Sequence, residues 1–328
     1  MEQLAYIIGE ETVRKYLTPE DVIDITEKTW RWYGEGKVVM PNKITTDMSG
    51  LGVAGWFNSM PAYIGPMDTA GIKLVGGYDG NKALGLPYIK ANVMLTDPRT
   101  GILKALISGD YINDVRTGAQ PAVMVKLLAA KTDVVTIIGT GLMAYYSLLC
   151  MSKTVDIKEV RLCDISEAAK DGFIARFPDA PWKFVKCATN EEGCRGADVI
   201  VTVTNANADL VEEPWLKEGS LVMTMGSFRE TSFDVVRKAD KIAVDQVGQS
   251  LHRGNVKELA EMGEIDENSF DIIVPDVLAG KSVGRTDPKQ RIYAQIIGTG
   301  MLDVACGGLV LQKMEAAGEK PFQYDMKK

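Results

Sequence analysis

The sequence contains almost no histidine. His252 is the one histidine among 328 residues, which excludes metal sites built from several histidines and leaves little room for histidine-centred acid–base catalysis. Any proton transfer is therefore expected to use Lys, Asp, Glu or water. A proton-donor role for His252 stays open, beside the alternative of an ordinary structural loop residue.

Cysteine is scarce and is not spaced for metal binding. The five cysteines are odd in number and include no Cys-x-x-Cys pair, so the sequence indicates neither a disulfide framework nor a zinc site. We expect no metal, and the pattern favours reduced thiols in a cytoplasmic protein. The cysteines are Cys150, Cys163, Cys187, Cys194 and Cys306.

Long apolar runs and an excess of positive charge are also missing. No run of about 18 apolar residues occurs, and the first residues lack the basic start and apolar stretch of a signal peptide. The 37 Lys and Arg residues against 44 Asp and Glu residues give a net charge of −7, which leaves no basic field for a polyphosphate. We expect neither a membrane nor a nucleic acid as a partner.

The sequence does have the composition of a folded protein, with 46% hydrophobic and 25% charged residues. At roughly 100 to 200 residues per domain, its length suggests two domains. Residues 116–300 alternate short apolar runs with helical stretches, which predicts a Rossmann-type doubly wound α/β domain with a parallel sheet. The apolar runs are Val134 to Ile138, Val160 to Cys163, Phe184 to Cys187, Val199 to Thr204, Leu221 to Met225 and Ile242 to Val244.

The first 115 residues follow a different pattern. A helix opened by Pro19-Glu20-Asp21 precedes segments that Gly and Pro interrupt, and short alternating segments such as Ala91 to Leu95 and Ile102 to Ile107 indicate antiparallel or mixed β structure. An Ala- and Leu-rich helix near the end of the chain is expected to return to this part. The pattern predicts a second, α+β domain from residues 1–115 plus about 301–328.

A glycine-rich loop marks a candidate nucleotide site. Gly139-Thr140-Gly141-Leu142-Met143-Ala144 matches G-x-G-x-x-A, directly after a predicted strand and at the start of a helical run. In that position the glycines allow a tight turn and let the backbone approach a pyrophosphate at the helix N-terminus. The loop predicts a dinucleotide site, with a ligand-free strand–helix turn as the alternative.

Two further strand ends indicate which dinucleotide would bind. Asp164 ends the next strand, where a carboxylate accepts hydrogen bonds from the adenosine ribose and repels a 2′-phosphate. The cofactor is therefore expected to be NAD(H), although Asp164 also suits a helix N-cap. Thr204 ends another strand at the same edge of the sheet and is expected to lie beside the cofactor.

Two basic residues stand in unusual surroundings. Lys73 is a lone charge in an apolar alternating run, which indicates either a partly buried ammonium with a partner or an edge-strand lysine that opposes aggregation. Arg116 precedes the Rossmann half, in Asp114-Val115-Arg116-Thr117-Gly118-Ala119. It is a candidate clamp for a carboxylate or phosphate, against the alternative of a solvated surface arginine.

Taken together, the ordered motifs resemble the ornithine cyclodeaminase/μ-crystallin family over about residues 8 to 315. Members include archaeal-type alanine dehydrogenases, ketimine and iminosuccinate reductases, opine-type dehydrogenases and ornithine cyclodeaminases, which all move a hydride at an amino-acid α-carbon. The motifs are Met40-Pro41, Met60-Pro61, Gly71-Ile72-Lys73, Gly85-Leu86-Pro87, Arg116-Thr117-Gly118-Ala119, the loop at Gly139, and Thr299-Gly300 followed by Asp303-Val304-Ala305.

The resemblance implies roles for individual residues and a homodimer formed through the first domain. Lys73 and Arg116 match the residues that hold the substrate carboxylate, so they are the catalytic candidates, and Asn58 and Phe228 stand at substrate-site positions. The expected cofactor contacts, from the resemblance and the loop together, are Thr117, Gly139, Thr140, Gly141, Leu142, Met143, Asp164, Thr204, Thr299 and Gly300.

The sequence departs from the family pattern at three positions. Asn58 stands near where many members have a carboxylate-binding Arg, and Phe228 replaces the Asp that binds the side-chain amine of ornithine in cyclodeaminases. Met143 replaces a common Gln in the glycine loop, which leaves the phosphate turn intact. Arg229 and Arg253 are possible substitutes for the missing anion clamp.

These observations predict an NAD(H)-dependent oxidoreductase that acts on the Cα–N bond of an amino acid or its imine. An ornithine cyclodeaminase, which converts ornithine to proline and ammonia, is the alternative enzyme. A μ-crystallin-like protein that binds nucleotide and ligand without turnover is the alternative from another class. The sequence leaves open the substrate side chain, the amine partner, the direction and the stereochemistry.

Overall fold

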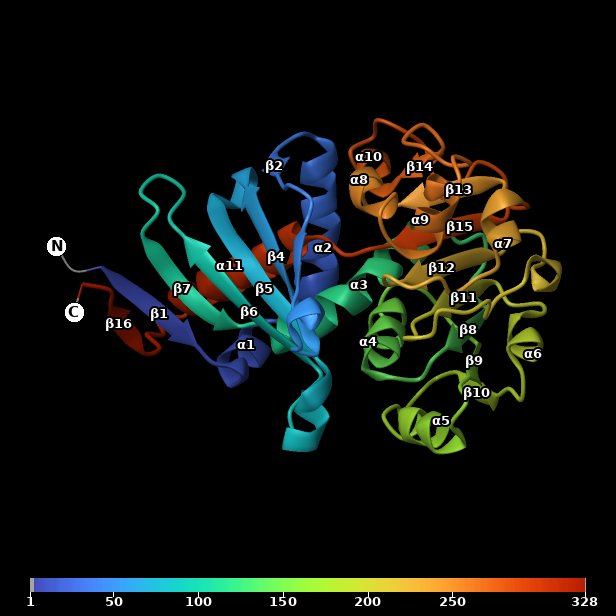
Figure 1. The fold of residues 1–328 in the computed structure, drawn as a ribbon, viewed down its shortest axis with the longest axis horizontal. Coiled ribbons are helices and arrows are strands. Elements are labelled where there is room, and N and C mark those ends of the chain that lie inside the picture. The colour runs from blue at the N-terminus through green and yellow to red at the C-terminus, as the bar shows by residue number, and fades with distance from the viewer. Residues whose placement is uncertain (1–2, 328) are drawn as a thin grey trace. The chain divides into compact units, whose positions relative to one another are not determined.

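The structure is a computed structural model that describes residues 3–327. The chain divides into two compact units, of which unit 1 is the described part of Met1–Arg116 with Thr299–Lys328 and unit 2 is Thr117–Gly298 (Figure 1). No helix among the described residues is long and apolar enough to cross a membrane.

Unit 1 is a mixed β-sheet with helices packed on it. Its strands are β1 (Leu4–Ile8), β2 (Val38–Val39), β3 (Ile44–Asp47), β4 (Gly55–Ile64), β5 (Thr69–Tyr78), β6 (Ile89–Thr96), β7 (Leu103–Ser108) and β16 (Gln323–Asp325). They pair in the order β16-β1-β7-β6-β5-β4-β2, with β3 also on β4, and every pair is antiparallel except β1 with β7. The helices are α1 (Glu10–Tyr16), α2 (Pro19–Gly34), the start of α3 (Asp110–Leu128), α11 (Gly300–Ala316) and the 3₁₀ turns η1 (Ser49–Leu51), η2 (Gly65–Met67) and η3 (Asp79–Leu84).

Helix α2 begins where its sequence predicts. The Thr18 hydroxyl accepts a hydrogen bond from the Asp21 N–H, and the Asp21 carboxylate accepts one from the Thr18 N–H, which forms a capping box ahead of Pro19. Helix α11 contacts α2 and strands β4, β5 and β6, and it runs along one face of the sheet (Figure 1). That face is the buried core of unit 1.

The strand register decides which side chains reach this inner face. Lys73 is paired across the sheet with Met60 and Val93, and Val93 is paired in turn with Ile107. Paired residues of neighbouring strands point to the same face, and all four of these side chains are buried. Lys73 therefore points into the helix-covered core.

The opposite face of the same sheet is apolar but exposed. The neighbouring row of the register joins Ile72, Met94, Leu106 and Ile7, one residue along from the buried row, so its side chains point outward. Ile7, Met94 and Leu106 are all exposed, and so is Leu74 two residues after Ile72. Unit 1 thus presents an apolar sheet surface, called here the outer face.

Unit 2 is a parallel sheet between helices. Its strands are β8 (Val134–Ile138), β9 (Glu159–Cys163), β10 (Lys183–Lys186), β11 (Val199–Thr202), β12 (Leu221–Met225), β13 (Lys241–Val244), β14 (Ile272–Ile273) and β15 (Ile292–Ile296). Its helices are the rest of α3, α4 (Leu142–Met151), α5 (Glu167–Ile174), α6 (Asn190–Cys194), η4 (Glu213–Trp215), α7 (Phe233–Arg237), α8 (Val247–Ser250), α9 (Gly254–Glu261) and α10 (Val274–Leu278).

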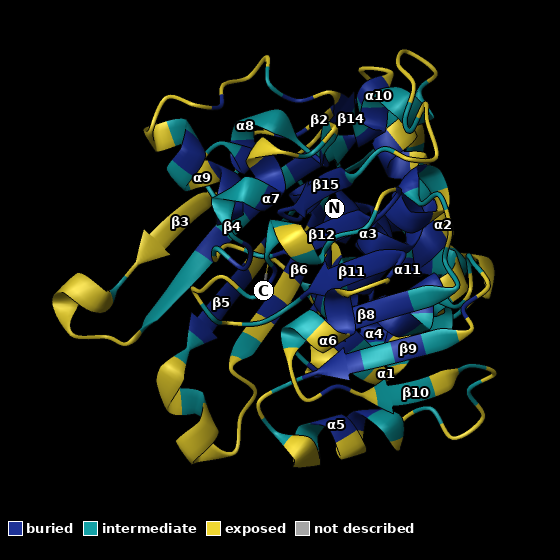
Figure 2. Cartoon of the chain, turned by 90° about the vertical axis from the view of Figure 1, so that its right-hand side faces the viewer, coloured by how far each residue is buried: buried dark blue, intermediate teal, exposed yellow. Residues whose placement is uncertain are grey.

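The strand order in unit 2 is β10-β9-β8-β11-β12-β15-β13-β14, and all pairs are parallel. The chain moves outward from β8 through β9 to β10 and then returns to the other side of β8 at β11. The predicted doubly wound α/β class is therefore confirmed, and the central strands are fully buried (Figure 2). Ligands of such sheets bind at the strand ends where the order reverses, here between β8 and β11.

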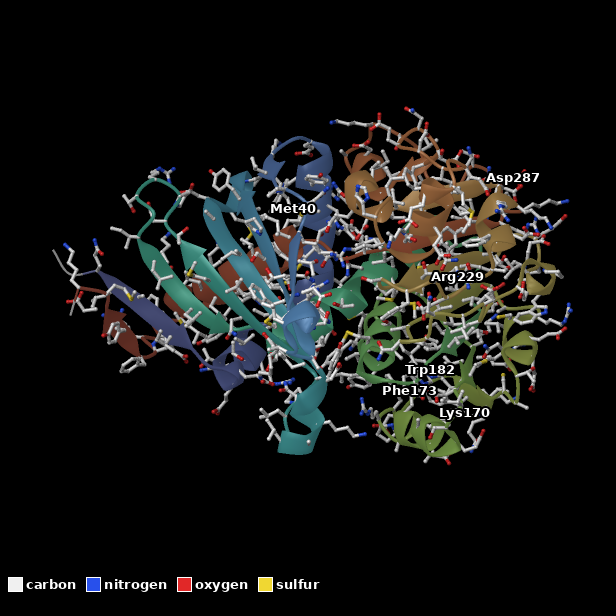
Figure 3. The ribbon with its side chains drawn as sticks, viewed as in Figure 1. Met40, Lys170, Phe173, Trp182, Arg229 and Asp287 are labelled. Carbon is white, nitrogen blue, oxygen red and sulfur yellow. The ribbon has the colours of Figure 1, made fainter. Side chains whose placement is uncertain are left out.

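Two packing features hold helices of unit 2 in place, one between α3 and α4 and one between α5 and the edge strand β10. A Cβ on Gly118 of α3 would lie 2.3 Å from the Tyr146 carbonyl carbon of α4, so only glycine lets the two helices approach this closely. The rings of Phe173 on α5 and Phe184 on β10 meet edge-on, with their centroids 6.3 Å apart, and this contact anchors α5 to the sheet. The ring of Trp182 packs beside them, with its centroid 6.0 Å from that of Phe184 (Figure 3).

Candidate functional site

The first group of predicted site residues lies inside unit 1, around Lys73. The Lys73 side chain is 0% exposed on β5, and its Nζ lies 2.9 Å from Asp303 Oδ1 and donates to Asn113 Oδ1 at 2.7 Å. Strand β5 lies between β4 and β6, so the edge-strand interpretation of Lys73 is wrong. The lysine is a buried ammonium with partners from two helices.

Arg116 joins the same group from α3. It is 7% exposed, its Nε donates to Asp303 Oδ1 at 3.0 Å, and its Nη2 donates to Asn113 Oδ1 at 3.0 Å. The interpretation as a solvated surface arginine is therefore wrong. Asn113 and Arg116 are three residues apart on α3, which places both side chains on one face of the helix.

The four residues bring two cations together, and a further carboxyl group, that of Asp114, accepts a hydrogen bond from Asn113 Nδ2 at 3.2 Å. Burial raises the pKa of Asp114 to about 6, while the hydrogen bond from Asn113 and the charges of Arg116 and Lys73 oppose that shift. Lys73 and Arg116 share one carboxylate, that of Asp303, and one neutral amide, that of Asn113. Burial and the neighbouring Arg116 lower the pKa of Lys73 to about 8, while Asp303 opposes that shift. Each cation has more N–H donors than these contacts use. The group can therefore bind an anion such as a carboxylate with charge-assisted hydrogen bonds.

Two buried oxygens on the first turn of α11 also lack partners. Asp303 Oδ2 and Thr299 Oγ1 have no hydrogen-bond partner among the described residues, and they are four residues apart, on one face of the helix. Buried polar atoms are normally satisfied, so this end of α11 is suited to a polar ligand. Gly300 is required here because a Cβ would lie 2.7 Å from the Met60 carbonyl oxygen.

The sequence patterns predict no role for Asp303, although it belongs to one of the family motifs. The available signal is an acidic residue inside a helix rich in Ala and Leu, because a buried carboxylate requires a cationic or hydrogen-bonding partner.

Asn58 is buried on the inner face, two residues from Met60 on β4, and its Oδ1 accepts a hydrogen bond from Thr45 at 2.6 Å.

The second group of predicted site residues lies in unit 2, at the reversal point of the sheet. Gly139 has a φ of +91°, and a Cβ there would lie 2.8 Å from Thr204 Cγ2 and 2.9 Å from the Val203 carbonyl oxygen. Gly141 is the N-cap of α4 and supplies no side-chain cap. The first N–H groups of α4 are therefore available to a pyrophosphate, next to the partly exposed Leu142 and Met143.

Asp164 ties this loop to the neighbouring strand. Its Oδ2 accepts hydrogen bonds from the Thr140 N–H and hydroxyl, both at 2.8 Å, and its Oδ1 accepts one from the Ser166 N–H at 2.9 Å. Although burial acts to raise it, these bonds hold the pKa of Asp164 below its ordinary value. Ser166, not Asp164, is the N-cap of α5. Asp164 therefore presents an ionised carboxylate at the loop, and the group fits a dinucleotide.

Thr117 follows Arg116 on α3 and is partly buried at the start of unit 2. Phe228 lies after β12 and is 46% exposed, while His252 is exposed in the turn before α9. The exposure of Phe228 and His252 does not assign either residue a role in binding.

The two candidate substitute arginines are held differently. Arg229 forms ion pairs with Asp209 and with Glu258, the latter at 3.6 Å, so acidic groups already balance its charge (Figure 3). Arg253 Nη1 donates to Ser227 Oγ at 3.4 Å, and burial lowers the pKa of Arg253. Arg229 is therefore the weaker candidate for an anion clamp.

Residues 6–318 match the model of the ornithine cyclodeaminase/mu-crystallin family. The chain is similar to the alanine dehydrogenase of Archaeoglobus fulgidus, with 29% identity over 93% of this chain and 94% of that one. It is also similar to the Δ1-pyrroline-2-carboxylate reductase of Bacillus cereus, with 30% identity over 75% of this chain and 77% of that one.

A solved structure of an archaeal alanine dehydrogenase dimer with bound NAD superimposes with a TM-score of 0.91 and 27% identity, over 98% of this chain and 99% of that one. The match covers nearly the whole chain and therefore both units. The resemblance noted in the sequence motifs is confirmed, and the chain belongs to the ornithine cyclodeaminase/mu-crystallin family.

Proposed function

We propose that this protein is an NAD(H)-dependent oxidoreductase that acts on the Cα–N bond of an amino acid or its imine. The observation that carries the proposal is the buried group of Lys73, Arg116, Asn113 and Asp303, in which two neighbouring cations have more N–H donors than these contacts use and so suit a substrate carboxylate. The relatives named alanine dehydrogenase and Δ1-pyrroline-2-carboxylate reductase support this class of substrate.

Unit 2 is the proposed cofactor domain. The first turn of α4 would bind the pyrophosphate, and the Asp164 carboxylate would accept hydrogen bonds from the adenosine ribose while it holds Thr140. When bound, NAD(H) supplies or accepts the hydride. Leu142 and Met143 flank the pyrophosphate position, and family resemblance adds Thr117, Thr299 and Gly300 as contacts.

Unit 1 is the proposed substrate and dimerisation domain. Lys73 Nζ and the Arg116 guanidinium would hold the substrate carboxylate and so fix the orientation of the neighbouring α-carbon. Because a protonated imine is already electrophilic, this positioning supplies much of what hydride transfer requires. Asn58 and Phe228 carry no charge, which argues against a substrate with a distal amine such as ornithine.

Assembly and location complete the proposal. The outer face of unit 1 is a sheet surface with a row of exposed apolar side chains, which favours burial against a second copy of the chain. The dimeric archaeal relative supports a homodimer. The five cysteines are buried and form no disulfide within the described part of the chain, which supports a cytoplasmic location.

The test of this function is a panel of 2-oxo acids offered with ammonia, methylamine or an amino acid and followed by NADH absorbance. We expect NADH to be consumed with one 2-oxo acid and one amine together. Ammonia release from ornithine without net change in NADH would instead indicate cyclodeamination. Tight binding without either reaction would indicate a ligand-binding protein.

Removal of the Lys73 charge is expected to weaken substrate use selectively. Lys73→Met keeps the buried volume but takes away one charge-assisted contact, worth about 1.5 to 3 kcal/mol. The kcat/KM for the 2-oxo acid should then fall roughly tenfold to over a hundredfold, while NADH affinity stays nearly unchanged. The matched control is Lys131→Met, at an exposed lysine of the loop between α3 and β8, and full activity in Lys73→Met would refute the clamp.

Asp164 is expected to set the preference for NADH over NADPH. Asp164→Asn removes the charge but keeps an oxygen that can accept from Thr140, so it separates repulsion of a 2′-phosphate from support of the loop. The ratio of kcat/KM for NADH to kcat/KM for NADPH should fall by a factor that corresponds to about 1 to 3 kcal/mol. Asp179→Asn, at an exposed loop position, is the control. A preference of the unmodified protein for NADPH would contradict this role.

The outer face is expected to be the dimer interface. Leu106→Glu places a charge in the middle of the exposed apolar row, where its burial against a second copy would be unfavourable. Light scattering should show a dimer for the unmodified protein and a monomer for Leu106→Glu. Leu84→Glu, at an exposed leucine of η3 outside this row, should remain dimeric. A monomeric unmodified protein would rule out the interface.

A further inference from the structure

Glu230 is a buried carboxylate that neither group of predicted site residues includes. We propose that Glu230 is a positioning residue of the dinucleotide site, which fixes the end of β11 against the glycine loop by holding Thr204. This inference rests on the proposed function, because it assumes that the loop at Gly139 binds NAD(H).

The contacts of Glu230 all lie within unit 2. Its side chain is 1% exposed after β12. Oε1 accepts hydrogen bonds from the Thr204 N–H at 2.6 Å and the Thr204 hydroxyl at 2.7 Å, and Oε2 accepts one from the Thr202 hydroxyl at 3.0 Å. The Glu230 N–H donates to Asn255 Oδ1 of α9 at 2.8 Å. Asn255 thus holds the backbone of Glu230, while the Glu230 carboxylate holds Thr202 at the end of β11 and Thr204 two residues after it.

Thr204 is the part of this contact that matters for the cofactor. Its Cγ2 and the Val203 carbonyl oxygen are the atoms that a Cβ on Gly139 would meet within 3 Å. The end of β11 therefore forms one wall against the first glycine of the loop, at the reversal point between β8 and β11 where a dinucleotide binds. A displacement of Thr204 would therefore change the packing of this segment against Gly139.

Burial of the Glu230 carboxyl without a neighbouring cation is unfavourable for folding, which argues that the residue has a role beyond folding. No lysine or arginine among the described residues forms a salt bridge with Glu230, so the carboxylate is held by hydrogen bonds alone. Burial raises the pKa of Glu230 to about 7, with the hydrogen bonds from Thr204 and Thr202 opposing the shift, and its charge also acts on Tyr293 of β15. A buried carboxyl without a cation weakens folding when ionised, whereas an apolar side chain would avoid that cost but would leave the Thr204 N–H without its acceptor.

The experiment compares NADH binding by Glu230→Met, Glu230→Gln and the unmodified full-length protein, measured by nicotinamide fluorescence without turnover. Glu230→Met loses the acceptors of Thr204 and should weaken NADH binding about tenfold or more. Glu230→Gln keeps an oxygen for Thr204 and an N–H₂ group for the Thr202 hydroxyl, so binding should stay within about threefold. In turnover, KM for NADH should rise in Glu230→Met while KM for the 2-oxo acid at saturating NADH stays unchanged.

A matched control and a second variant complete the design. Glu218→Met, at an exposed glutamate, should bind NADH as the unmodified protein does. Thr204→Val removes the hydrogen bond that the Thr204 hydroxyl donates to Glu230 and the one that it accepts from the Ala206 N–H, and it should weaken NADH binding about threefold. Unchanged binding in this variant overturns the role of Glu230 even if Glu230→Met does not fold.

The results separate this inference from the proposed function. Unchanged NADH binding in Glu230→Met, or in Thr204→Val, overturns the role of Glu230, and so does a Gln variant as weak as the Met variant. If the protein binds NADH and the variants behave as expected but no substrate is reduced, the proposed function fails and the role of Glu230 stands. If the unmodified protein does not bind NADH, both are wrong.

Discussion

One carboxylate oxygen, Asp303 Oδ1, lies within 3.0 Å of both Lys73 Nζ and Arg116 Nε. Two like charges in an apolar core would repel each other and lose their hydration, so neither would be stable there without this partner. The contact also joins β5, α3 and α11, three elements far apart in the chain. Because one carboxylate oxygen meets two cations, both keep N–H donors that a substrate carboxylate would use under the proposed function.

Because successive side chains of a strand point to opposite faces, the same sheet carries both the charged group and the apolar outer face. Lys73 points into the helix-covered core, while Ile72, its neighbour on β5, belongs to the exposed apolar row. A one-residue shift of this strand would exchange the two faces and remove the cation from the site. The outer face and the charged group therefore depend on the same register, which links the proposed dimerisation surface to the substrate clamp.

Local patterns predicted the elements better than their arrangement. The strands at 134–138 and 221–225 were predicted to the residue, because a strand buried on both faces is a continuous apolar run. By contrast, the place of β15 between β12 and β13 depends on pairing with strands that are distant in the chain. The lone charge of Lys73 indicated a buried partner, but its partner Asp303 is 230 positions later and no local pattern connects them. Glu230 was not predicted for the same reason, since its contacts at the end of β11 and just after it are 28 and 26 positions away.

The most direct test of the shared-carboxylate account is the pH dependence of kcat/KM for the 2-oxo acid, which reports groups of the free enzyme. The pKa of Lys73 is lowered to about 8, so the ammonium loses its proton as the pH rises and kcat/KM should fall above about pH 8. Asp303 raises the pKa of Lys73, so Asp303→Asn should move that fall to lower pH. A profile that stays flat through about pH 9.5, or a fall that Asp303→Asn leaves in place, would contradict the account.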